Sequence, residues 1–168
     1  AVVSSVIALH VIGLLQARGL DLAAAVALGA LIGPAQVGAR LVEMTLGPRF
    51  HPIWTLVTAV GLVLCGLATL ALTHWAALAL LLYGAGNGLF SIARGTVPLA
   101  LFGRDGYGAL MGRLALPALL AAALAPSLGA VAIESLGAGA TLAILAAASA
   151  GSMILALVLR ARATGGTP

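Results

Sequence analysis

The long stretches of the sequence without a single charged side chain include residues 52–73 and 135–159. An α-helix rises about 1.5 Å per residue, so about 20 apolar residues are needed to cross the ~30 Å hydrocarbon core of a bilayer. Both stretches meet this length. Two such stretches in one chain are typical of a membrane protein with several spanning helices.

The scarcity of charge elsewhere in the chain supports the same class. Charged residues make up 7% of the 168 residues, whereas soluble domains average about 25%. So few charges cannot cover a water-exposed surface, and most of the surface is therefore predicted to face lipid. The net charge of +4 comes from arginines that lie mainly between the apolar stretches. We interpret this excess as a signal of membrane topology and expect no nucleic-acid partner.

Six helices are predicted from the apolar segments and from the Gly, Pro and polar residues that separate them. Their expected bounds are about residues 1–18, 22–43, 53–72, 76–102, 108–133 and 138–160. The whole chain, residues 1–168, is expected to form one transmembrane domain. The predicted fold class is thus an all-α membrane protein, a bundle of six transmembrane helices.

The arginines are divided unevenly between the two sides of this bundle. Cytoplasmic loops of membrane proteins carry an excess of basic residues. One side has Arg18 alone, and the other has Arg40, Arg49, Arg104, Arg113, Arg160 and Arg162. Both ends of the segment are therefore predicted to be cytoplasmic, in a cell membrane that is expected to be a bacterial inner membrane.

Polar side chains recur on one face of the predicted helix 76–102. Tyr83, Asn87, Ser91 and Arg94 follow each other at helical spacing, which places them on one side. At about 1.5 Å per residue, Asn87 lies roughly 16 Å from the outer end, near the midplane. Polar groups at this depth usually face a partner or a water-filled cavity. These four residues are candidates for a substrate cavity, although interhelical hydrogen bonding or snorkelling of Arg94 would also explain them.

Other predicted helices carry polar groups at depth as well. His10, near the centre of the first helix, is a fifth candidate for the substrate cavity, as a proton carrier, although a hydrogen-bonded packing role would also explain it. Gln36, Arg40 and Glu43 follow each other in the second helix. Helices 53–72 and 138–160 carry no charge apart from Arg160 at the end of the second, and they are expected to face lipid. The glycines of Gly84-Ala-Gly-Asn-Gly88 are expected to allow close helix packing.

Several of these features resemble the C-terminal half of a major facilitator superfamily transporter. They are the six predicted spans, Gly33-Pro-Ala-Gln-Val-Gly-Ala-Arg40, the basic loop with Arg49, and Gly84-Ala-Gly-Asn-Gly88 leading to Arg94 and Pro98. The family's loop motif is represented by Gly38, Arg40 and Arg49, without its Asp. The resemblance extends over essentially the whole chain.

The resemblance implies a 3+3 inverted repeat and a substrate site between two six-helix halves near the midplane. It further implies alternating access by rocking of the halves, with Gln36, Arg40, Glu43 and Arg49 as candidates for a cytoplasmic gate. The expected function is secondary active transport of a small solute, with a proton as a candidate coupling ion. The expected partners are the lipid bilayer, the small-molecule substrate, and an N-terminal half or a second copy.

Other functional classes receive less support from the sequence. No nucleophile–base motif or His-Glu-x-x-His motif occurs, so no enzyme activity, catalytic residue, cofactor or metal site is predicted. The alternatives are a membrane scaffold that does not transport and a half-size carrier that works as a homodimer. A scaffold should have a filled and dry polar face, whereas a homodimer should pair across that face.

Overall fold

The computed structural model describes residues 2–164 and is helical almost throughout. The elements are α1 (Val2–Gln16), α2 (Leu22–Gly29), α3 (Ile32–Leu46), the 3-10 turn η1 (Gly47–Arg49), α4 (Pro52–Leu72), α5 (Ala76–Phe102) and α6 (Tyr107–Thr164). No strand occurs in this described part of the chain. Four segments, Leu22–Leu46, Pro52–Leu72, Ala76–Phe102 and Tyr107–Ala163, are long and apolar enough to cross a membrane. The predicted all-helical fold class is confirmed.

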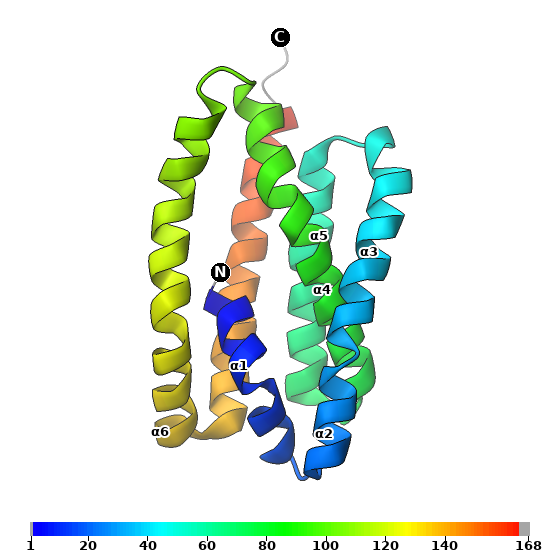
Figure 1. The fold of residues 1–168 in the computed structure, drawn as a ribbon, viewed down its shortest axis with the longest axis vertical. Coiled ribbons are helices and arrows are strands. Elements are labelled where there is room, and N and C mark those ends of the chain that lie inside the picture. Colours follow the sequence, from blue (N-terminus) through cyan, green and yellow to red (C-terminus); the bar gives the residue numbers. More distant parts are fainter. Residues whose placement is uncertain (1, 165–168) are drawn as a thin grey trace.

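The helices lie side by side along one long axis of the molecule (Figure 1). The connections near residues 17–21 and 73–75 lie at one end of the bundle, together with the bend of α6 at Gly137. The connections 47–51 and 103–106 lie at the opposite end, near the last residues of α6. Loops that the arginine pattern assigns to a common side therefore do share an end of the bundle.

The predicted helix 22–43 is divided into α2 and α3 by a short turn at Ala30 and Leu31. Pro34 explains the position of this turn. Proline has no amide hydrogen, so it cannot bond to the carbonyl four residues earlier, which is that of Ala30. The first turn of α3 nevertheless continues in the same direction, because the Ala35 amide donates to the Leu31 carbonyl at 3.1 Å. The single predicted helix 22–43 is therefore interrupted near its proline.

The predicted helices 108–133 and 138–160 form one element, α6, with helical backbone on both sides of a single interruption. At Gly137 the backbone has φ 82° and ψ 165°, a conformation that residues with a Cβ rarely adopt. The chain reverses its direction there (Figure 1). The expected loop of several residues is thus reduced to one glycine.

The first helix is shorter than the other apolar segments. α1 has 15 residues, which corresponds to a length of about 22 Å, less than the ~30 Å hydrocarbon core. Its first residues lie about halfway along the bundle (Figure 1). The main apolar core surrounds the rest of α1 and includes Ile7, Leu14 and Leu15 from α1, Leu67 from α4, Leu80 from α5 and Leu142 from α6. One half of the bundle is therefore well packed, and α1 is absent from much of the other half.

Glycines bring α5 into close contact with two neighbouring helices. A Cβ added at Gly88 would lie 2.6 Å from the Gln36 carbonyl oxygen of α3, and one at Gly86 would lie 2.6 Å from the Ala59 carbonyl oxygen of α4. Such distances leave no room for a side chain, so the helices touch through their backbones. The expected packing role of these glycines is confirmed, and α5 is held between α3 and α4.

The outer surface of the bundle is rich in large apolar side chains. Leu72 is 83% exposed, Leu155 is 71% exposed and Met44 is 70% exposed, and many other Leu, Ile and Val side chains are more than a third exposed. A soluble monomer rarely exposes apolar surface on this scale. The long apolar helices and their apolar outer faces indicate a membrane-spanning protein.

Candidate functional site

A cavity of about 840 Å³ lies beside the first residues of α1, between α3, α5 and the first part of α6. Its polar lining comes from Ser4 and Ser5 of α1, Arg40 of α3, and Asn87, Ser91 and Arg94 of α5. Its apolar lining comes from Phe90, Met111, Leu114, Leu119 and four small residues. Neither α4 nor the part of α6 after Gly137 lines it. The cavity combines a mostly apolar wall with a few convergent polar groups, as small-molecule sites do.

Asn87 is placed in the cavity wall by its neighbour on α1. The Ser4 hydroxyl donates a 3.0 Å hydrogen bond to the Asn87 amide oxygen. The Asn87 NH2 group carries two donors, and neither is used by another described residue. One turn further along α5, the Ser91 hydroxyl donates to the Gly88 carbonyl at 2.6 Å. Asn87 thus presents donors to the cavity, whereas the Ser91 hydrogen is used within the helix.

Arg40 and Arg94 come to similar levels of the bundle because α3 and α5 run in parallel. Gly84 contacts Ile32, and Gly88 contacts Gln36, so the register is the same at both contacts. One further turn brings Arg40 opposite Ile92, two residues before Arg94. The side chain of Arg94 is exposed, and the Nε of Arg40 is buried without a hydrogen-bond partner in the described structure. None of the described residues in the lining is acidic.

Two of the predicted cavity residues lie outside the cavity lining. Tyr83 is buried in the main core, beside Ser4. His10 is half-buried between α1 and α6, and its Nε2–H donates to the Pro126 carbonyl oxygen at 3.0 Å. The predicted helical face is therefore divided, with Tyr83 packing in the core and Asn87, Ser91 and Arg94 lining the cavity.

The position of His10 predicts a role in stability. Replacing His10 with Leu removes the donor to Pro126, and we expect the free energy of unfolding in an SDS titration to fall by about 1–3 kcal/mol. His10→Gln keeps an N–H donor of similar reach and should retain most of this stability. A His10→Gln protein that unfolds like the parent but loses proton-driven uptake would instead make His10 the proton carrier.

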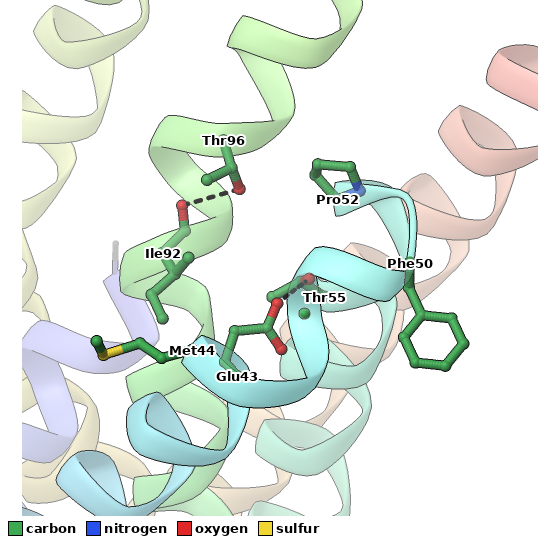
Figure 2. A pocket seen from close by; sticks show the side chains of 8 residues that line it. Glu43, Met44, Phe50, Pro52, Thr55, Ile92 and Thr96 are labelled. Atoms are coloured by element: carbon green, nitrogen blue, oxygen red, sulfur yellow. Dashed lines mark hydrogen bonds between the residues drawn. The ribbon is translucent and has the colours of Figure 1, made fainter.

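The four predicted gate residues are not brought together. Arg40 lines the cavity, and the backbone of Gln36 packs against Gly88. Arg49 is exposed in η1. Glu43 lies in a second cavity of about 450 Å³ at the same end of the bundle, shown in Figure 2. There its carboxylate accepts a hydrogen bond from the Thr55 hydroxyl of α4 at 2.5 Å.

The sequence interpretation placed the contribution of α1 to the cavity at His10 and missed the two serines of this helix. Ser4 and Ser5 line the cavity, but two adjacent serines in an apolar helix are no strong signal, because hydroxyls can bond to their own backbone. The aromatic ring of Phe90 and the small residues of α6 were also not expected. The depth of Ser4 on α1 relative to Asn87 on α5 depends on tertiary contacts, so it could not be predicted from the sequence.

Among the described residues, no group of three or more His, Cys, Asp or Glu side chains is close enough to hold a metal ion. The lining of the described cavity offers hydrogen-bond donors and positive charge for binding a ligand. Comparisons with protein-family models, with curated proteins and with solved structures give no match to the chain. The geometry of the cavity is therefore the basis for the functional proposal.

Proposed function

We propose that the chain is one six-span half of a secondary active transporter of the major facilitator type, and that the cavity beside α1 is its part of the substrate pathway. The observation that carries the proposal is a cavity whose polar groups converge near the middle of α5. Asn87 lies 11 residues from the start of the 27-residue α5, or about 16 Å along it, near its middle. Polar groups at this depth are retained where they contact water, a partner or a substrate.

The arrangement of the chain supports this proposal. If the two parts of α6 on either side of Gly137 each cross the membrane, and α2 and α3 cross it together, these three passes and those of α4 and α5 make five. α1, which begins about halfway along the bundle, forms part of a sixth. The 3+3 inverted repeat follows as part of the same proposal. By the arginine pattern, the end with connections 47–51 and 103–106 faces the cytoplasm. The cavity then lies in the cytoplasmic half.

The proposed mechanism needs a second half. The cavity is lined on one side by α3 and α5 and on another by α6, and a partner half would close the remaining side. Rocking of the two halves would then expose the cavity alternately to each side of the membrane. The partner is an N-terminal six-helix half or a second copy of the chain.

A scaffold that does not transport is the second candidate. Its support is the tight, glycine-mediated packing of α5 between α3 and α4, which would suit a rigid assembly unit. A scaffold does not need a hydrated cavity that opens to both sides.

Thiol labelling in native membranes separates the two functions. With Cys65 replaced by Ala, Ser91→Cys should react with a membrane-impermeant maleimide from both sides, because alternating access brings water to the cavity from each side in turn. Thiols react as thiolates, which require water. Leu155→Cys is the control, because Leu155 is 71% exposed on the part of α6 that does not line the cavity. It should face lipid and stay unlabelled.

Three results are informative in this experiment. Labelling of Ser91→Cys from both sides supports alternating access. Labelling from one side alone indicates a static cavity and contradicts a transporter. No labelling from either side indicates a dry polar face, as expected for the scaffold.

A further inference from the structure

We infer that the cavity binds an anionic group, a carboxylate or a phosphate, between Arg40 and Arg94. The inference rests on the proposed function, since it assigns a substrate class to the same cavity. It follows from three properties of the lining, namely its charge, its hydrogen-bonding capacity and the unpaired state of its arginines.

The charge of the lining has one sign. Among the described residues that line the cavity, Arg40 and Arg94 are the two charged ones, and none is Asp or Glu. In the described structure neither arginine forms an ion pair or a hydrogen bond with a protein group. Two guanidinium groups at similar depth repel one another, and an anion placed between them would remove this repulsion. The nearest carboxylate along α3, that of Glu43, lies in the second cavity and accepts from Thr55.

The free hydrogen-bonding groups of the lining are mainly donors. Each guanidinium has five N–H donors and no acceptor. The Asn87 oxygen already accepts from Ser4, which leaves the Asn87 NH2 group for a ligand. A donor-rich site matches a ligand with several acceptor oxygens and no hydrogens of its own. Carboxylate and phosphate fit this description, and arginine binds both through two parallel hydrogen bonds.

The Nε of Arg40 indicates where in the cavity the anion would bind. It is buried and has no hydrogen-bond partner among the described residues. A buried donor without a partner is costly, and the cost is higher for a charged group. A rotation of the Arg40 side chain that uncovers the Nε would let an anion accept from the Nε–H and one terminal N–H, in the planar geometry that arginine favours. Arg94, whose side chain is exposed in the same cavity, can reach the ligand from α5.

Thermal unfolding of the protein in phosphatidylcholine nanodiscs tests the inference. The probes are inorganic phosphate and succinate, with succinamide as the uncharged analogue of succinate and sodium chloride to match ionic strength. At least one of the two anions should raise the unfolding midpoint in a saturable way, and succinamide should not. Arg94→Gln and Arg40→Gln should each weaken the apparent affinity by about 10- to 100-fold, the loss expected for a charge-assisted hydrogen bond.

Two further variants separate binding from folding and from general charge. Arg94→Lys keeps the charge without the planar pair of donors and should weaken binding less than Arg94→Gln. Arg113→Gln removes a positive charge from the same end of the bundle, at an exposed position that does not line the cavity, and should bind like the parent. The unfolding midpoint without ligand shows whether each variant folds.

Nanodiscs with phosphatidylglycerol distinguish a free anion from a lipid headgroup. One outcome is that phosphatidylglycerol stabilises the parent but not Arg94→Gln, and that it competes with phosphate or succinate. This result supports the anion site but makes a lipid its ligand, which contradicts the proposed transport of a solute. If the anions bind but Ser91→Cys is labelled from one side alone, the anion site again stands without transport. The inference is overturned by any of three results. Succinamide stabilises the protein as much as succinate does, both glutamine variants bind the anions with the parent's affinity, or no anion stabilises the protein.

Discussion

Replacing Gly86 with Ala is expected to lower the free energy of unfolding by about 2–3 kcal/mol, as overpacking of a close contact does. The added Cβ would lie 2.6 Å from the Ala59 carbonyl oxygen and 2.7 Å from the Val63 amide nitrogen of α4. Both are backbone atoms, so no side-chain rotation can relieve the clash and the two helices must separate. An SDS titration monitored by circular dichroism measures the effect.

Gly95 of the same helix provides the matched control. A Cβ at Gly95 meets one atom, the Tyr107 hydroxyl oxygen, at an ordinary 3.6 Å. Alanine is a better helix former than glycine by up to about 1 kcal/mol, so Gly95→Ala should be neutral or stabilising. Equal stability of Gly86→Ala and the parent would show that α4 and α5 are further apart than the structure has them.

Replacing Asn87 with Leu is expected to reduce transport about 100-fold while reducing stability far less. The change leaves the Ser4 hydroxyl without its acceptor and exposes an apolar group to the polar part of the substrate. An unsatisfied polar group costs about 1–3 kcal/mol, and two such losses in the substrate complex correspond to a factor of about 100. Substrate uptake into proteoliposomes measures the transport rate, and an SDS titration of the same preparation measures the free energy of unfolding.

Asn87→Gln serves as the conservative comparison. It retains the amide and its donors on a side chain one methylene longer, so part of the transport activity should return. If Asn87→Leu takes up substrate at the parent's rate, Asn87 does not contact the transported molecule. If uptake and the free energy of unfolding fall in proportion, Asn87 contributes to helix packing rather than to binding.

The bounds of the helices with strong local signals were predicted closely. α4 begins at Pro52 after His51, whose ring accepts from the Ile53 amide, and α5 ends before Gly103, which has a positive φ. Caps, prolines and positive-φ glycines act within a few residues of themselves, so the sequence reveals them. The sequence did not reveal that the helical backbone extends up to Gly137, because no local signal distinguishes a reversal at one residue from a longer loop.

The candidate site was predicted less completely, because it depends on contacts between helices. The spacing along α5 identified Asn87, Ser91 and Arg94, which do line the cavity. The same spacing included Tyr83, which packs in the core because it faces α1 at a level where that helix is present. Arg40 was assigned to a gate, but the register of α3 against α5 places it in the cavity lining with Arg94.

The walls of the cavity differ in how they are joined to the rest of the protein. The α3–α5 wall is fastened by backbone contacts at Gly84 and Gly88, which cannot slide without a clash. On the opposite side, α1 and α6 are linked to one another through His10 and Pro126 and through Val6 against Gly129. A change in the width of the cavity therefore has to come from α1 and the first part of α6 moving away from α5, which breaks the hydrogen bond from Ser4 to Asn87.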